Sequence, residues 1–341
     1  MKAVVFREFG DVDTLKYTDF PDPDVKPGEV LIKVRACALN HLDIWERQGL
    51  SGVALPHISG SDVSGIVEDI GEGVEGMTRG DEILVSPGIS CMRCERCLRG
   101  DDNQCGHYTI LGYRNNGGYA EYVSVPAVNV IPKPQHLTFG EAASVPLVFL
   151  TAWHMLVGRA GIKPGDSVLV QAGGSGVGIA AIQIAKLFGA YVITTAGSDD
   201  KIEKAKALGA DHAVNYTRHD FEEEVKRLTG GQGVDIVIDH IGPEVWDKSI
   251  RSLARNGRLV TCGSTSGPSV GFDLRYVFSR HLSLLGSYMG KKAELLELLR
   301  FVDSGRLKPV VHRVFKLKDA AMAQQEMLER KNFGKIVLEV G

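Results

Sequence analysis

Residues 167–186 read S-V-L-V-Q-A-G-G-S-G-V-G-I-A-A-I-Q-I-A-K, and no other part of the chain constrains the architecture as strongly. A short apolar run leads into a glycine-rich turn and then into an apolar helical pattern, which predicts the order strand, turn, helix. The backbone N–H groups of such a turn and the positive end of the helix can bind a pyrophosphate. The outer glycines of the G-x-G-x-x-G pattern are present, but serine takes the middle position. The expected cofactor contacts are Gly173, Gly174, Ser175, Gly176, Val177 and Gly178.

The residues around this stretch alternate between strand and helix patterns. Six alternations of this kind predict an α/β fold with a doubly wound parallel Rossmann sheet. The residues before it, up to about 130, read instead as short strands separated by Gly, Pro and Asp, which predicts a β-rich, barrel-like unit. With 341 residues, the chain is long enough for two cores. The predicted strands of the parallel sheet are Ser167–Ala172, Tyr191–Ala196, Ala213–Tyr216, Val234–His240, Gly257–Gly263 and Leu282–Ser287.

Composition excludes several classes of function. The net charge of −3 gives no basic surface for nucleic acid. The N-terminus has no signal-peptide pattern, and the apolar stretch at 142–153 is too short to span a bilayer and contains a proline. Cys37 and Cys262 lie in apolar, strand-like contexts typical of buried, reduced thiols. We therefore expect a cytoplasmic protein with no membrane or nucleic-acid partner.

A second motif lies in a polar loop, where residues 90–105 read S-C-M-R-C-E-R-C-L-R-G-D-D-N-Q-C. This loop holds four of the six cysteines, in the spacing C-x2-C-x2-C-x7-C. Four thiolates with no open position are typical of a structural zinc site. An iron–sulfur cluster is the alternative, but in ferredoxins the fourth cysteine lies closer and is followed by proline, whereas Gly106 follows here. Two disulfides are the other alternative. The pattern favours one Zn²⁺ per chain, bound by Cys91, Cys94, Cys97 and Cys105.

This cysteine spacing resembles the structural-zinc lobe of the medium-chain dehydrogenase/reductases, the superfamily of zinc alcohol dehydrogenases and quinone oxidoreductases. The resemblance covers the whole chain. It implies a GroES-like catalytic domain at 1–150 and 290–341 with the zinc lobe at about 88–108, and a Rossmann dinucleotide-binding domain at 151–289. It also implies a homodimer or homotetramer, for which the strand L-S-L-L-G-S-Y at 282–288 offers a sheet edge.

The end of the second strand of the Rossmann domain indicates which cofactor is bound. NAD enzymes carry an acid there for the ribose 2′-hydroxyl, but this chain has Ala196. The resemblance to quinone oxidoreductases implies instead a 2′-phosphate site made by Ser198, Lys201, Tyr216 and Arg330. Alternatively, Lys201 is a solvated lysine, and Asp199 or Asp200 reaches the ribose. We favour NADP(H) over NAD(H). Further cofactor contacts expected on the family pattern are Thr151, Cys262 and Gly263.

The resemblance also reveals what is absent. The three protein ligands of the catalytic zinc in alcohol dehydrogenases correspond to Asn40, Ser61 and Leu147, and the proton-relay positions hold Leu42 and Trp45. We therefore expect no catalytic zinc. The chain instead carries A-L-N-H-L-D at 38–43 and G-S-D-V-S-G at 60–65, which resemble the metal-free site of quinone oxidoreductases. The predicted catalytic residues are Asn40, His41, Asp43, Trp45, Asp62 and Leu147.

Within this set, we expect the Asn40 amide to orient the substrate carbonyl or the nicotinamide ribose. Trp45, Leu147, Phe149 and Trp153 would line an apolar pocket, although core packing explains each of these equally well. Without a Lewis acid, a conjugated acceptor is easier to reduce because it spreads the arriving charge. The predicted function is NADPH-dependent reduction of a quinone, enone or other carbonyl. An alcohol dehydrogenase or ketone reductase, and a non-catalytic NADPH-binding protein, are the alternatives.

Overall fold

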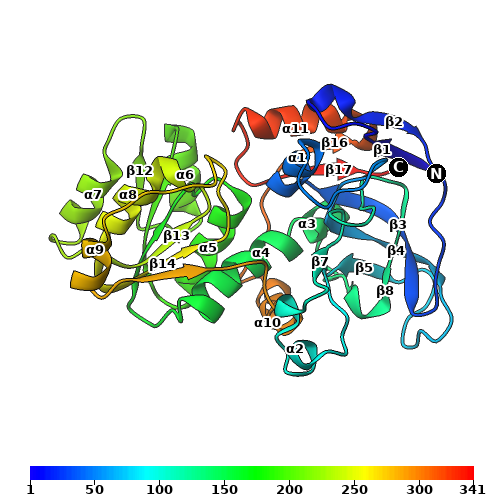
Figure 1. Cartoon of the computed structure of the whole chain (residues 1–341), viewed down its shortest axis with the longest axis horizontal. Coiled ribbons are helices and arrows are strands. Elements are labelled where there is room, and N and C mark those ends of the chain that lie inside the picture. Colours follow the sequence, from blue (N-terminus) through cyan, green and yellow to red (C-terminus); the bar gives the residue numbers. More distant parts are fainter. The chain divides into compact units, whose positions relative to one another are not determined.

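The computed structural model describes residues 1–341, which form two compact units. The first unit comprises Met1–Leu147, Lys291–Asp303 and Lys308–Gly341. The second comprises Val148–Gly290 and Ser304–Leu307. Figure 1 shows that each unit is built around its own sheet.

The second unit is built on a six-stranded sheet in the order β12-β11-β10-β13-β14-β15, with every pair of neighbours parallel. This order confirms the predicted doubly wound sheet. It also brings β10 beside β13, the switch point outside whose carboxyl ends such sheets bind ligands. The strands are β10 (Ser167–Val170), β11 (Tyr191–Ala196), β12 (His212–Asn215), β13 (Val234–Asp239), β14 (Leu253–Thr261) and β15 (Ser283–Gly286).

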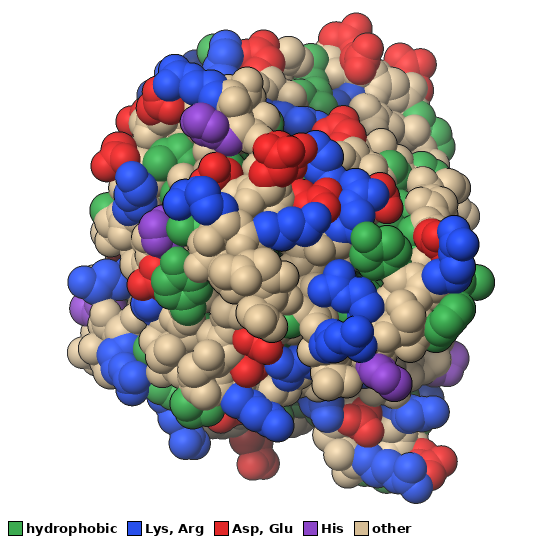
Figure 2. All heavy atoms as spheres, turned by 90° about the vertical axis from the view of Figure 1, so that its left-hand side faces the viewer, with side chains coloured by type: hydrophobic (Ala, Val, Ile, Leu, Met, Phe, Trp, Pro, Cys, Tyr) green, Lys and Arg blue, Asp and Glu red, His purple; other side chains and the backbone are tan.

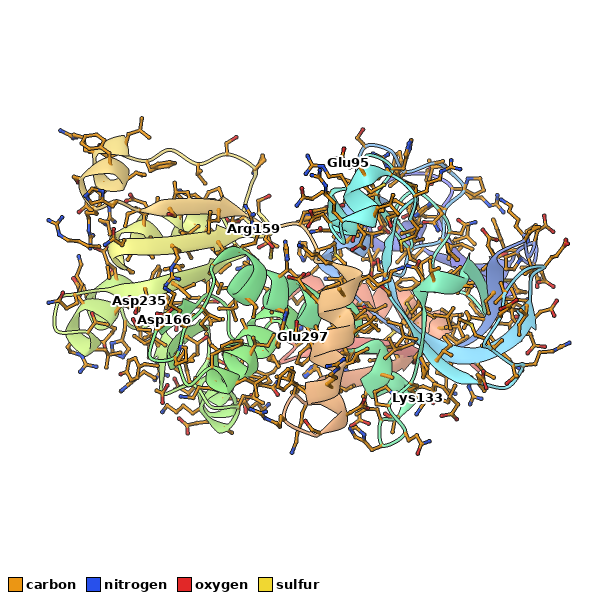
Figure 3. All side chains as sticks on the ribbon, turned by 90° about the horizontal axis from the view of Figure 1, so that it is seen from below. Glu95, Lys133, Arg159, Asp166, Asp235 and Glu297 are labelled. Atoms are coloured by element: carbon orange, nitrogen blue, oxygen red, sulfur yellow. The ribbon has the colours of Figure 1, made fainter.

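Helices cover the faces of this sheet, as parallel strands require, because every crossover must run over a face. Their buried side chains, such as Val225 and Ile250, pack on apolar strands with almost no exposed surface. The helices are α5 (Gly176–Leu187), α6 (Asp199–Ala207), α7 (Phe221–Leu228), α8 (Pro243–Arg251) and α9 (Leu274–Ser279). Side-chain contacts connect the strands at their amino ends. Ser167 donates from N and Oγ to Asp235, and Asp166 forms an ion pair with Arg258 at 2.9 Å (Figure 3).

The first unit contains a seven-stranded sheet in the order β16-β17-β3-β4-β5-β9, with β8 also paired to β3. The C-terminal β17 lies antiparallel to β3, so the tail of the chain completes a sheet begun near the N-terminus. The strands are β3 (Glu29–Ala38), β4 (Asp62–Ile70), β5 (Glu82–Val85), β8 (Tyr122–Pro126), β9 (Val130–Pro132), β16 (Val311–Lys316) and β17 (Lys335–Glu339). A separate antiparallel pair joins β1 (Lys2–Val5) and β2 (Lys16–Asp19).

The helices of the first unit lie at the ends and faces of its sheet. They are α1 (His41–Arg47), α3 (Phe139–Ala143), α10 (Lys292–Asp303) and α11 (Ala320–Leu328). The next helix after α3, α4 (Pro146–Trp153), lies mostly in the second unit. The continuous helical run Phe139–Arg159 is long and apolar enough to cross a membrane, but 78% of its most apolar window is buried inside the protein. Buried apolar helices of globular domains pass the same test, so burial accounts for its composition.

The cysteine loop forms a small lobe of the first unit. The lobe contains the strand pair β6 (Gly88–Ile89) and β7 (Thr109–Ile110) and the short helix α2 (Glu95–Leu98), whose first residue Glu95 is labelled in Figure 3. Two consecutive lysines at the start of α10 attach to this lobe. Lys291 Nζ lies 2.6 Å from Asp101, and the Lys292 N–H donates to Asp102 at 3.1 Å.

Candidate metal centre and active site

The four cysteines of the lobe converge on one point. Their Sγ atoms all lie within 4.8 Å of one another. Neighbouring sulfurs are 3.5 Å apart for Cys91 and Cys105, 3.6 Å for Cys94 and Cys97, and 3.8 Å for Cys94 and Cys105. Four ligands at the Zn–S bond length of about 2.3 Å in a tetrahedron have sulfurs about 3.8 Å apart. The cluster therefore fits a structural zinc.

Backbone N–H groups add to this fit. The His107 N–H donates to the Sγ of Cys105 at 3.4 Å. Backbone hydrogen bonds from Arg93 and Cys94 lower the pKa of Cys91 to about 6, which favours the thiolate that a metal needs. No pair of these sulfurs lies at bonding distance, and all six cysteines are free thiols. Bound there, zinc would cross-link residues 91–105 and supply folding free energy rather than chemistry.

The glycine-rich turn in the second unit has the form that the sequence predicts. A Cβ on Gly173 would lie 2.2 Å from Thr194 Oγ1, and one on Gly178 would lie 2.2 Å from the carbonyl oxygen of Ala172. Both positions therefore exclude a side chain. Ser175, at the middle position, is the N-cap of α5, and its hydroxyl accepts the Gly178 N–H at 2.9 Å. The serine thus satisfies one of the unpaired N–H groups of the helix start.

A histidine that the sequence analysis did not single out joins this turn. His240 follows β13, and its Nε2 lies 2.9 Å from the Ser175 hydroxyl. Beside it, Asp239 is fully buried and accepts the backbone N–H groups of Ile241 and Gly242, while burial raises its pKa to about 6. Cys262 lies at the end of the next strand, where burial raises the pKa of its thiol to about 12, so it stays protonated. Gly263 follows it, and a Cβ there would lie 3.3 Å from the carbonyl oxygen of His240.

Three of the four residues expected at the 2′-phosphate, Ser198, Lys201 and Tyr216, lie around the start of α6. Ser198 is the N-cap of α6 and accepts the Lys201 N–H at 3.4 Å. The Lys201 side chain is half-buried, and desolvation lowers its pKa. The phenol of Tyr216 covers the backbone of Gly197, since a Cβ on that glycine would lie 2.6 Å from the phenolic oxygen. Thr151 is buried in α4 of the same unit, and Arg330 belongs to the first unit.

The predicted catalytic residues of the first unit surround a buried ion pair. Asp62 begins β4 and is completely buried, and its carboxylate accepts hydrogen bonds from Leu147 N at 2.8 Å and Asn40 Nδ2 at 3.0 Å. Lys335, the first residue of β17, donates to Asp62 at 3.0 Å, to Asn40 Oδ1 at 2.6 Å and to the carbonyl oxygen of Leu39 at 2.6 Å. One carboxylate and one ammonium therefore hold together three of the expected site positions.

The side chain of Asn40 has internal hydrogen-bond partners. Its side chain is only 6% exposed, its amide oxygen accepts from Lys335, and its amide nitrogen donates to Asp62 and more weakly to the carbonyl oxygen of Ala38. The amide that we expected to face a substrate is therefore already satisfied inside the protein. Asn40 is also the N-cap of α1, and its N–H donates to Asp43 at 2.9 Å.

The same positions do not fit the catalytic zinc that the family resemblance raises. Leu147 offers no ligand atom, and the oxygen of Asn40 is taken by Lys335. The hydroxyl of Ser61 is buried without a hydrogen-bond partner. The nearby carboxylate of Asp62 is already neutralised by an ammonium. A zinc site needs three converging N, O or S donors, and this corner does not supply them.

Other predicted positions differ in what they contact. The rings of His41 and Trp45 meet edge-on at 5.1 Å, and burial and the positive charge of Arg330 lower the pKa of His41. Phe149 and Trp153, predicted as pocket walls, are 1% and 2% exposed, and Trp153 packs on Phe188. Core packing therefore accounts for the last two, while His41, Trp45 and Leu147 keep partly exposed side chains.

Two further acidic residues, Asp43 and Glu46 of α1, are buried in the first unit. Asp43 accepts from the hydroxyl of Tyr119 at 2.7 Å, and burial raises the pKa of Asp43 to about 6. Glu46, one turn later in α1, has no exposed surface and no hydrogen bond to either carboxyl oxygen. Burial and then the charge of Asp43 raise the pKa of Glu46 well above 4.5. His57 lies 4.0 Å away, but burial lowers its pKa, so it provides no counter-charge at neutral pH.

Glu46 therefore makes stability depend on pH. At a pH below 4.5, the ordinary pKa of a glutamate, Glu46 is protonated in both the folded and the unfolded chain. Above pH 4.5, Glu46 loses its proton in the unfolded chain but keeps it in the folded chain. The free energy of unfolding therefore falls by at most about 1.4 kcal/mol per pH unit. Glu46→Gln should flatten the decline of unfolding free energy between pH 5 and 8, as measured by urea denaturation. The exposed Glu75→Gln is the control, and parallel pH profiles for wild type and Glu46→Gln would contradict the assignment.

Known proteins share this architecture. Residues 26–135 match the family described as alcohol dehydrogenase GroES-like domain, and residues 176–304 match the family described as zinc-binding dehydrogenase. A NAD-dependent alcohol dehydrogenase of Sulfolobus acidocaldarius is 32% identical over 349 residues, which cover 100% of both chains. A crotonyl-CoA reductase of Streptomyces avermitilis is 32% identical over 93% of this chain and 80% of its own length. A solved structure of a NAD-dependent alcohol dehydrogenase is 52% identical, covers 100% of both chains and superimposes with a TM-score of 0.97.

Proposed function

The chain belongs to the medium-chain dehydrogenase/reductase superfamily and is an oxidoreductase, and from this premise we propose that it transfers a hydride from NADPH to a quinone, an enone or a related conjugated carbonyl without a catalytic zinc. The observation that carries the proposal is the corner built by Asp62 and Lys335, in which the zinc-ligand positions are occupied by Asn40, Ser61 and Leu147. Similarity to a crotonyl-CoA reductase supports the substrate class, since that protein's name describes reduction of a conjugated acyl group.

The chemical argument starts from the charge that hydride transfer creates. A hydride delivered to an isolated ketone leaves an alkoxide, which needs a Lewis acid or strong hydrogen-bond donors. A hydride delivered to the β-carbon of an enone leaves an enolate, whose charge is already spread over several atoms. Asn40 and Lys335 donate their hydrogen bonds to partners inside the protein. They therefore stabilise the structure of the site rather than the negative charge on a substrate oxygen. A site of this kind favours the acceptor that stabilises its own charge.

The ends of β11 and β12 support NADP(H) as the cofactor. Ala196 stands where NAD enzymes carry the acid that binds the ribose 2′-hydroxyl. Near the end of β11, Ser198 and Tyr216 provide hydroxyls and Lys201 provides a cation. Both neighbouring acids are already paired, Asp199 with Arg218 and Asp200 with Lys204. Two of the similar proteins are named NAD-dependent, so the preference is a property to be measured on this chain.

One reaction pair tests the proposal. With NADPH saturating, 2-cyclohexen-1-one should be reduced at least about tenfold faster than cyclohexanone, because only the enone delocalises the incoming charge. Treatment with 1,10-phenanthroline for a time that leaves the four-cysteine zinc in place should not change this rate, and the non-chelating 1,7-isomer is the matched control. Faster reduction of cyclohexanone, or prompt loss of activity with the chelator alone, would favour an alcohol dehydrogenase instead. Binding of NADPH without turnover of any acceptor would favour a non-catalytic role.

We extend the proposal to partners and location. On the face seen in Figure 2, basic and acidic side chains are interspersed and no field of one sign is present, which supports the absence of a nucleic-acid partner. The edge strand β15 has no partner on its outer side, and Leu274, Phe278 and Tyr288 near it are 66%, 68% and 53% exposed. These features support a homodimer or homotetramer that pairs at this edge. A cytoplasmic location remains a prediction from the sequence.

A further inference from the structure

We propose that Arg218 is a specificity-determining residue for the cofactor, which acts by masking the charge of Asp199 rather than by contacting the 2′-phosphate itself. The inference rests on the proposed function, in that it concerns the nicotinamide cofactor of the same site. Neither the sequence motifs nor the family resemblance pointed to Arg218, which lies two residues beyond Tyr216 in the loop after β12.

The geometry around Asp199 carries the argument. Asp199 is the first residue of α6, directly after the N-cap Ser198. Its Oδ1 accepts from Asn215 Nδ2 at 2.7 Å, and its Oδ2 lies 2.8 Å from Arg218 Nη1. Both carboxylate oxygens are therefore engaged, one by a neutral amide and one by a guanidinium.

Strand pairing brings Asn215 and Arg218 close to Asp199. β11 and β12 run parallel with Ala196 opposite Asn215, and the Tyr216 N–H donates to the carbonyl oxygen of Ala196 at 3.1 Å. Asn215 is buried, and its Oδ1 accepts from both N and Oγ1 of Thr217, at 3.1 and 2.7 Å. The turn that presents Arg218 is thus held by the same asparagine that holds Asp199.

The consequence is electrostatic. Gly-rich dinucleotide sites discriminate against a 2′-phosphate with a carboxylate about 20 residues beyond the turn, and Asp199 is the first acid after that point in this chain. With Arg218 present, the charge of Asp199 is compensated, and Asp200 is paired with Lys204. Without Arg218, a bare carboxylate would repel the phosphate.

Masking and direct contact predict different results in a double-mutant cycle. The test measures dissociation constants of NADPH and NADH by cofactor fluorescence for wild type, Arg218→Ala, Asp199→Asn and Arg218→Ala/Asp199→Asn. We expect Arg218→Ala to lower the ratio of NADPH to NADH affinity by about three- to fivefold, mainly by weakening NADPH, because the pair of Arg218 and Asp199 is largely exposed. Adding Asp199→Asn should restore the ratio to within about twofold of wild type, because the charge to be masked is then gone.

Lys201→Ala is the matched comparison. It should also lower the ratio, but Asp199→Asn should not restore it, because Lys201 is expected to act on the phosphate directly. An unchanged ratio in Arg218→Ala, or a ratio that Asp199→Asn fails to restore, would overturn the inference. A wild-type preference for NADH would instead overturn the proposed cofactor. In that case the inference is judged by whether Arg218→Ala shifts the same ratio further toward NADH and Asp199→Asn reverses the shift.

Discussion

Replacing Lys335 with methionine should lower the unfolding free energy at pH 7 by about 3–5 kcal/mol, the cost of leaving one partner of a buried ion pair unpaired. Lys335 is 4% exposed and Asp62 is completely buried, so neither can be solvated without local unfolding. The three hydrogen bonds of the ammonium also disappear, which releases Asn40 and the end of β3. Urea denaturation of the purified protein measures the effect.

Two further variants show that the charge is responsible. In Lys335→Met/Asp62→Asn, both charges are gone, so the double variant should recover much of the loss despite carrying a second substitution. Lys133→Met is the matched single change, because Lys133 (labelled in Figure 3) is also buried. Its carboxylate partner Glu82 is 53% exposed, so water can solvate that carboxylate when the lysine is lost. Equal losses for Lys133→Met and Lys335→Met, or no recovery in the double variant, would show that packing rather than charge explains the result.

The second large effect concerns the zinc lobe. Purified, dialysed protein should contain close to one zinc per chain, and Cys97→Ser should remove most of it. Because metal binding at such a site is folding free energy, the variant should lose on the order of several kcal/mol or yield little folded protein. Atomic absorption and thermal unfolding measure the two consequences.

Cys37→Ala is the control for the loss of a thiol. Cys37 is buried outside the cluster, so the change should cost only about 1 kcal/mol and leave the zinc in place. The NADPH-dependent rate per folded Cys97→Ser molecule should stay near wild type, since the lobe supplies no catalytic group. Two zincs per chain in the wild type would contradict the description of the active site, and an iron–sulfur absorption band would contradict that of the lobe.

The architecture could be predicted because its signals are local. The glycine turn at 173–178 needs no distant partner to be recognised, since the strand before it and the helix after it are adjacent in the chain. The same holds for the cysteine lobe, whose four ligands lie within fifteen residues. Backbone periodicity placed β11 without error and the other five parallel strands with errors of one to four residues at one or both ends, where hydrogen bonding rather than composition decides the boundary.

The site was predicted less well because its decisive contacts are not local. Lys335 pairs with Asp62 across 273 positions, and the only signal of this in the sequence is a lysine that opens the apolar run K-I-V-L. Asn40 was recognised from its motif, but the motif does not show that its amide is already hydrogen-bonded. His240 and Arg218 gave no pattern at all, since each acts through a partner brought close only by strand pairing.

The return of the tail into the first sheet imposes an order on biosynthesis. β17 contributes an interior strand next to β3, yet it is made only after the whole of the second unit. Domains fold during translation as soon as their residues have emerged, so the second unit can fold on the ribosome while the first still lacks one strand and the counter-ion of Asp62. Until Lys335–Glu339 has left the ribosome, the first unit therefore lacks the strand that pairs with residues 36–38 of β3 and the counter-ion of Asp62.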